Sequence, residues 1–170
     1  MNNIKRVLYI VFGVAILMSC DESGTDPVTD TLRFDLFQSS DFDYSGVMEV
    51  YENSTGVLTV DIQLLGAQAS GVVFPAHLHF GPYDAPEAEI AFMLNPVSGD
   101  NLRSMTELGP LTNGNNLSFE DFKAFDGHVK VHLAADGPDY EVILVSGNVG
   151  VNYTAGSSID VNKISICSTE

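Results

Sequence analysis

The stretch GVLTVDIQLLG, residues 56–66, alternates apolar and polar side chains. The side chains that share its apolar face are Leu58, Val60, Ile62 and Leu64. Because successive side chains of a β-strand point to opposite faces, this pattern predicts a half-buried strand. The preceding stretch GVMEVYENSTG, residues 46–56, indicates a strand followed by a turn, so we expect the two strands to form a hairpin.

The same alternation recurs along the chain from residue 31. Further strands are predicted in TLRFDLF (31–37), VVFPAHLHF (72–80), AEIAFML (88–94), GHVKVHLA (127–134), YEVILVSGNV (140–149) and SIDVNKISI (158–166). Residues 118–125, SFEDFKAF, predict one short helix, which Ser118 would cap and whose first turn carries Glu120 and Asp121. Many short strands without an internal repeat predict a single all-β domain, either a sandwich or a barrel. Of the two we expect an antiparallel β-sandwich with Greek-key-like connections.

Residues 1–19 have the pattern of a signal peptide. Lys5 and Arg6 precede the apolar run VLYIVFGVAILM, which is shorter than the roughly 20 apolar residues that span a bilayer. The run ends in LMSC, which resembles the bacterial lipobox, so we expect Cys20 to be diacylated and to become the mature N-terminus. Residues 20–30 are then a lipidated cysteine with a flexible acidic tether, and residues 31–170 are the folded domain.

Charge excludes two classes of partner. The chain has 7 basic and 23 acidic side chains, a formal charge of -16, and loss of Lys5 and Arg6 with the signal peptide makes it -18. The remaining basic residues are scattered, which excludes nucleic acid binding. Electrostatic adhesion to anionic lipid is excluded for the same reason, so the membrane partner would be reached through the acyl chains on Cys20.

The acidic tether after Cys20 indicates in which membrane the protein resides, and Cys167 indicates whether the domain has a disulfide. The acidic start of the tether resembles the signal that sends some Gram-negative lipoproteins to the cell surface, whereas an aspartate directly after the cysteine resembles an inner-membrane retention signal in enteric bacteria. We expect the outer membrane or the cell surface rather than the inner membrane. With Cys20 lipidated, Cys167 has no partner for an intramolecular disulfide, and we expect it to be a packed strand residue.

The four histidines form two pairs, His77 with His79 and His128 with His132. Alternation places all four on outward faces, opposite the apolar residues of their strands. Strand residues rise about 3.3 Å each, so His77 and His79 would be about 6.6 Å apart and the second pair about 13 Å apart. If the two strands are neighbours, His77, His79 and one histidine of the second pair would converge on copper or zinc and leave an open position.

Two roles that need no metal stay open for the histidines. They would equally serve as polar residues on a solvated face, or hold the loop GPYDAPEAE, residues 81–89, by hydrogen bonds. A metal site predicts that affinity falls below about pH 6, because ligating imidazoles must be neutral.

Three stretches resemble the CHRD domain family, named after chordin. They are PAHLHFGPYDAPEAEIAFML (75–94), LNPVSGDNLRSMTEL (94–108) and LSFEDFKAFDGHVKVHLAADGPDYEVILVSGNVG (117–150), and the match covers roughly residues 32–152. The resemblance implies a secreted or cell-surface β-sandwich without a catalytic mechanism. It also selects His77, His79 and His132 as the family's recurrent histidines, with His128 where an aromatic is more usual and therefore an accessory candidate. Ser146 stands where the family has arginine.

The outline is also similar to copper/zinc superoxide dismutase, whose copper ligands His77, His79 and His132 would imitate. A histidine-rich zinc loop and the structural disulfide are missing, and no arginine follows Arg103. The charge of -18 would also repel superoxide. We therefore expect no such enzyme activity.

The leading functional hypothesis is a lipid-anchored envelope or surface binding module without catalysis, since no nucleophile–base set is recognisable. Its ligand would be a protein or a glycan. The alternative is a copper- or zinc-binding envelope protein that uses the outward histidines. Paired carboxylates (Asp41 with Asp43, Glu87 with Glu89) suggest hydrolysis only weakly, because acidic residues this frequent form such pairs by chance. A calcium site is also weakly indicated, because DFDYSG, residues 41–46, lacks the remaining ligands of a calcium loop.

Overall fold

The computed structural model describes residues 30–165. The predictions for the signal peptide, for lipidation of Cys20 and for Cys167 concern residues outside this range, and they stay predictions. Within the described range, no helix combines the length and the apolar character needed to cross a membrane.

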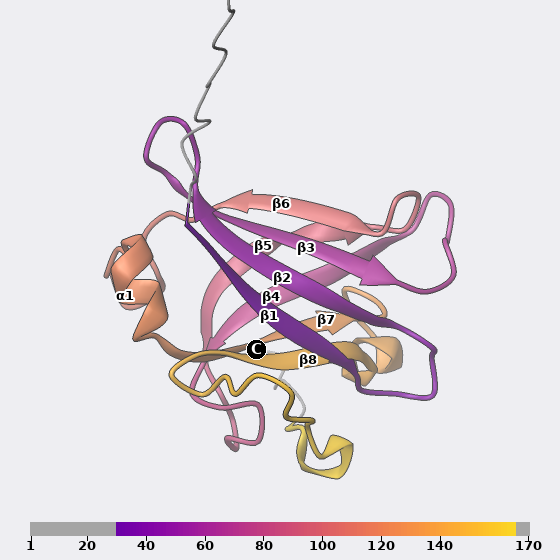
Figure 1. The fold of residues 1–170 in the computed structure, drawn as a ribbon. Helices are drawn as coiled ribbons and strands as arrows, with labels where there is room; N and C mark the ends of the chain where they lie inside the picture. The colour runs from indigo at the N-terminus through magenta and orange to yellow at the C-terminus, as the bar shows by residue number, and fades with distance from the viewer. Residues whose placement is uncertain (1–29, 166–170) are drawn as a thin grey trace, which may run out of the picture.

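The described chain folds into eight β-strands, one short α-helix and two 3₁₀ turns (Figure 1). The strands are β1 (Thr31–Gln38), β2 (Ser45–Glu52), β3 (Leu58–Leu65), β4 (Val73–Phe80), β5 (Ile90–Ser98), β6 (Arg103–Glu107), β7 (Asp126–His132) and β8 (Ile143–Gly150). The helix is α1 (Phe119–Lys123), and the 3₁₀ turns are η1 (Pro138–Glu141) and η2 (Val161–Lys163). The all-β class, the hairpin of β2 and β3, and the short helix are thus confirmed.

The strands close into an antiparallel barrel in the order β1-β2-β3-β6-β5-β4-β7-β8. The prediction of a β-sandwich was therefore wrong. Pairing of β1 with β8, through Phe37 with Ser146 and Gln38 with Val145, joins the first strand to the last. Both architectures require the same alternation along each strand, so the alternation carries no information about whether the sheet closes.

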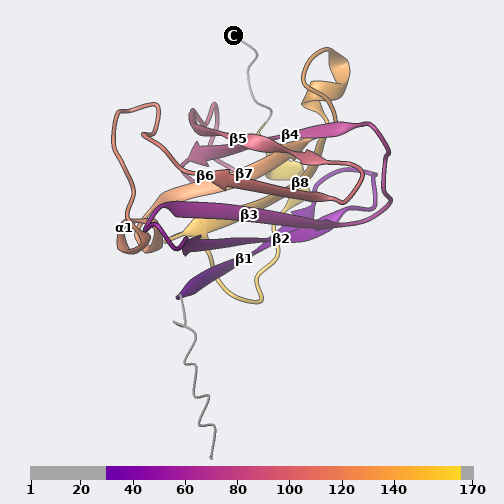
Figure 2. The same ribbon diagram turned by 90° about the horizontal axis from the view of Figure 1, so that it is seen from above.

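Side chains fill the interior of the barrel. In cross-strand register, Phe34 of β1 lies opposite Met48 of β2, which lies opposite Ile62 of β3. Across the barrel, β4 and β7 contribute Ala76, Leu78, Val129 and Val131 to the same buried core. Figure 2, seen from above, shows β4 and β5 on the side opposite β1 and β2. Because buried apolar side chains occupy the interior of this eight-stranded barrel, we look for a functional site outside the barrel or at its ends.

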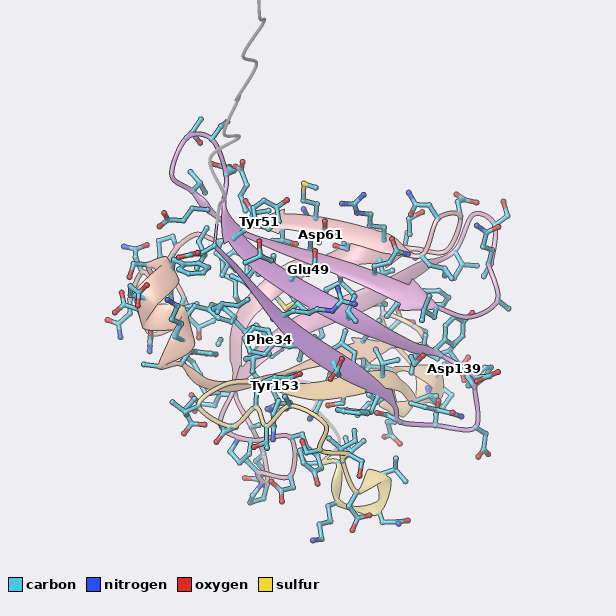
Figure 3. All side chains as sticks on the ribbon, viewed as in Figure 1. Phe34, Glu49, Tyr51, Asp61, Asp139 and Tyr153 are labelled. Carbon is cyan, nitrogen blue, oxygen red and sulfur yellow. The ribbon has the colours of Figure 1, made fainter. Side chains whose placement is uncertain are left out.

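The segment after β8 packs back over the closing seam. The Tyr153 hydroxyl donates to an Asp35 carboxylate oxygen at 3.0 Å, and the Tyr153 ring packs edge-on against Phe34 with centroids 5.1 Å apart (Figure 3). This segment therefore stabilises β1 at its junction with β8.

Strand β6 was not predicted, because its pattern is inverted. Ser104 and Thr106 face the interior opposite Ile62 and Val60, whereas Met105 points outward and is exposed. The buried hydroxyls are satisfied by the neighbouring strand: Ser104 donates to the Asn95 main-chain oxygen at 2.7 Å, and Thr106 accepts from the Asn95 main-chain N–H at 2.9 Å. Polar side chains in the core and an apolar one outside give no recognisable strand signal.

Helix α1 has the predicted cap, whereas the last predicted strand is absent from the described residues. Ser118 and Asp121 form a reciprocal capping box, in which the Ser118 side chain accepts from the Asp121 N–H. In the segment 158–166, residues up to 165 form η2 and irregular chain instead of a strand. Asp160 caps η2 by accepting from the Asn162 N–H, a local bond that competes with extended structure.

Candidate metal centre

Strands β4 and β7 are neighbours, which brings the two histidine pairs together. His77 lies opposite Lys130 and His79 lies opposite His128 in the antiparallel register. His77, His79 and His132 each offer one ligand atom, and these atoms lie within 4.8 Å of one another. The three residues are close enough to bind one metal ion, as expected for neighbouring strands. We call them the histidine trio.

The trio lies outside the barrel, yet it is buried. Each of the four histidines is 3 % exposed or less. The expected direction, away from the barrel core, is confirmed, but the expectation of a solvated face was wrong. Residues Gly81 and Ala88 of the loop after β4, together with η1, contact the imidazoles and form part of their cover.

Three hydrogen bonds define the protonation of the imidazoles. The Nδ1 atoms of His79, His128 and His132 lie 3.0, 2.7 and 2.7 Å from the main-chain oxygens of Ala88, Gly81 and Tyr140, respectively. A carbonyl oxygen only accepts, so each Nδ1 carries the proton and each neutral ring has its lone pair at Nε2. A histidine that binds metal is usually oriented by such a bond from its second nitrogen. The hypothesis from the sequence that these residues hold the 81–89 loop is therefore confirmed for His79 and His128.

Burial keeps the histidines neutral. It lowers the pKa of His77 to about 4, with the charges of His132 and Lys130 as smaller causes. Burial also lowers the pKa of His79 to about 3 and the pKa of His132 below its usual value. Neutral imidazoles are the form that binds metal, so the ligands are ready at neutral pH. We accordingly expect metal affinity to fall near pH 4. An ordinary imidazole would instead lose its metal near pH 6.

His77 differs from its neighbours in its hydrogen bonding. Its Nδ1 is buried and has no hydrogen-bond partner in the described part of the chain. A buried polar nitrogen without a partner costs free energy, roughly 1–3 kcal/mol. An ion bound at this Nδ1 would remove that cost.

His128 is placed beside the trio rather than in it. Its ring stacks on His79, with centroids 4.8 Å apart and planes 12° apart. Burial lowers its pKa to about 4. It therefore packs against a candidate ligand, and its accessory role in binding an ion stays a prediction.

Two residues near the trio were missed as functional candidates. Tyr140 of η1 stacks on His132 with centroids 4.5 Å apart and planes 2° apart, but its sequence context ADGPDYEV carries no signal of this contact. Lys130 lies opposite His77 on the histidine face of β7, is only 1 % exposed, and donates from its ammonium to the Ser165 main-chain oxygen at 2.7 Å. In GHVKVHLA the alternation does place Lys130 on the histidine face, and only its burial was unpredictable.

The chain matches no protein-family model, no curated protein and no solved structure. The site therefore has to be interpreted by its own chemistry. Three neutral imidazoles are a donor set suited to zinc and copper.

The carboxylate pairs do not form a comparable site. Asp41, Asp43, Glu87 and Glu89 are all exposed. Among residues 30–165, the histidine trio is the group of three or more potential ligands that lies close enough to hold an ion.

Proposed function

We propose that this protein binds a transition metal ion, copper or zinc, through His77, His79 and His132. The observation that carries the proposal is the convergence of three buried ligand atoms within 4.8 Å. Two of the rings are oriented by Nδ1 bonds to main-chain oxygens, which makes Nε2 their ligand atom. Support also comes from the unpartnered Nδ1 of His77. No catalytic step is part of the proposal.

The test is the metal content of the full chain, purified without a histidine tag, followed by titration with copper and zinc. We expect one ion per chain, lost when His77, His79 and His132 are all replaced by alanine. The matched control is His128→Asn, because the Asn amide can still donate to the Gly81 oxygen that His128 contacts. This variant should keep the ion. If neither metal binds the unaltered protein, the proposal fails.

We also propose the setting in which binding takes place. The lipobox-like LMSC, residues 17–20, supports a protein held by acyl chains on Cys20 in the outer membrane or at the cell surface. The CHRD-like stretches support a secreted, non-catalytic domain. Labelled palmitate should enter the protein in cells and should be lost with Cys20→Ala. Incorporation that persists in that variant would contradict the anchor.

A second candidate function is binding of a protein or glycan, favoured by a shallow groove of about 370 Å³ on the outer faces of β1, β2, β3 and β6. Two ion pairs line it, Arg33 with Glu49 at 2.5 Å and Arg103 with Asp61, and Figure 3 shows Glu49 and Asp61 on this side. Paired charges and exposed Leu65 suit a neutral polar ligand more than a charged one. A glycan array should reveal binding that Gln63→Ala weakens and the histidine variants leave unchanged. An array without binders would remove this candidate for glycans.

A further inference from the structure

Met93 of β5 is the exposed neighbour of the histidine trio. Strand β5 pairs with β4, and Met93 lies directly opposite His77 in the register. Met93 is 60 % exposed, whereas the histidines are almost inaccessible to solvent. A large apolar side chain thus lies in water beside a buried set of metal ligands.

The Met93 thioether can reach an ion held by His77. Directly opposed residues on one face of an antiparallel pair have Cβ atoms about 4.5–5.5 Å apart. Methionine has three rotatable bonds beyond its Cα, so its sulfur can move from solvent toward the trio without a change in the backbone. A thioether is a soft ligand that selects Cu(I), whereas protein zinc sites use thiolate, imidazole and carboxylate.

Charge near the trio also favours a monovalent ion. Lys130 of β7 lies opposite His77 across the β4–β7 pairing and is buried in the same layer. Coulomb energy scales with the charge of the ion, so a divalent cation meets twice the repulsion that a monovalent one meets at the same place.

We infer that the ion of this site is Cu(I), and that Met93 ligates it together with the histidine trio. The inference rests on the proposed metal-binding function and adds the identity of the ion and a fourth, sulfur ligand. An exposed thioether beside buried imidazoles provides a first contact for Cu(I) arriving from solvent. The flexible side chain then folds over the bound ion.

The experiment is an anaerobic titration of the full chain with Cu(I) against a chromogenic Cu(I) chelator, with a parallel titration with Zn(II). Met93→Leu is compared with Met105→Leu, a matched control that is 50 % exposed on β6 and lies opposite Asp61 instead of a histidine. Both changes conserve volume. We expect Cu(I) to bind more tightly than Zn(II) by on the order of a hundredfold, as a soft ligand set implies. Met93→Leu should weaken Cu(I) binding by on the order of tenfold and leave Zn(II) binding unchanged, while Met105→Leu should match the unaltered protein.

Four outcomes would overturn the inference in distinguishable ways. Zn(II) binding that equals or exceeds Cu(I) binding would refute the identity of the ion and leave the proposed function standing. Equal effects of the two leucine variants would remove Met93 as a ligand. If the triple histidine variant bound Cu(I) with the affinity of the unaltered protein, the ion would belong to another part of the chain. An absence of binding for both ions would refute the proposed function itself.

Discussion

Tyr140 fixes both the protonation and the plane of His132. Its main-chain oxygen accepts the Nδ1 proton of His132 at 2.7 Å, while its ring lies parallel to the same imidazole at 4.5 Å. The hydrogen bond sets which nitrogen carries the lone pair, and the stack limits rotation of the ring. The short turn η1 therefore holds one member of the histidine trio in a geometry suited to an ion.

Replacing Tyr140 should weaken both the fold and the site. We expect Tyr140→Ala to lower the free energy of unfolding by about 3 kcal/mol, because a mostly buried aromatic ring is lost. Metal affinity should fall roughly tenfold or more, since the ring no longer supports His132. Tyr140→Phe keeps the stacking face and should retain most of the affinity. Urea unfolding and metal titration of both variants test this, and equal losses of affinity would show that the ring face has no role.

Acid should destabilise the metal-free protein through its histidines. The unfolded chain takes up protons near the ordinary histidine pKa of 6.5, whereas the folded chain resists protonation until about pH 4 at His77 and His128 and about pH 3 at His79. Because the unfolded state binds more protons in this interval, the histidine contribution is complete above pH 6.5 and is lost as pH falls toward 4. Each histidine contributes at most about 1.4 kcal/mol per pH unit.

The measurement is the free energy of unfolding between pH 7.5 and 4.5 for the unaltered chain and for His128→Asn. The variant has one histidine fewer, so its unfolding should take up fewer protons, by up to about one. The slope of its unfolding free energy against pH should be correspondingly smaller. Superimposable slopes would mean that His128 does not resist protonation in the folded state.

Gly147 permits the closing strands to approach. A Cβ at this position would lie 2.3 Å from the Asp35 main-chain oxygen, well short of van der Waals contact distance, and 3.0 Å from the Leu36 side chain. We expect Gly147→Ala to destabilise the protein by about 2–3 kcal/mol, the usual cost of overpacking. Gly109→Ala is the control, because its Cβ would meet only the Phe92 ring at 3.7 Å. Thermal unfolding compares them, and similar midpoints would argue against a tight β1–β8 seam.

The interior hydroxyl of Thr106 should be important to β6. Thr106→Val keeps the shape of the side chain but removes the acceptor of the Asn95 N–H. We expect a loss of about 1–3 kcal/mol from the unsatisfied main-chain donor. Thr106→Ser keeps the hydroxyl and should cost less. Chemical denaturation of the two variants measures these losses of stability. A valine variant as stable as the unaltered protein would show that water replaces the hydroxyl.

Sequence patterns predicted most strands but not the way in which they are arranged. The alternation of apolar residues located β1 to β5, β7 and β8, and the Ser118 cap located α1. It missed β6, where Ser104 and Thr106 face inward, and it predicted a strand across 158–165 where η2 forms. Closure of the barrel depends on the pairing of β1 with β8, which no local pattern encodes.

The candidate site was predicted in its members but not in its environment. Strand alternation and rise allowed His77, His79 and one further histidine to converge, and the family resemblance selected His132. Alternation reports the face of a strand but not what covers that face. The burial of the histidines depends on segments such as η1 and the loop at Ala88, whose positions follow from tertiary packing.

The order of the strands along the chain has a consequence for when an ion can be taken up. His77 and His79 belong to β4 and His132 to β7, with β5, β6 and α1 between them in the sequence. In an unfolded chain His132 is far along the sequence from His77 and His79, so the three-imidazole site comes into being with the barrel. A chain that is exported unfolded would leave the cytoplasm without a completed site. The compartment where the chain folds, and not the one where it is synthesised, would then determine which metal it carries.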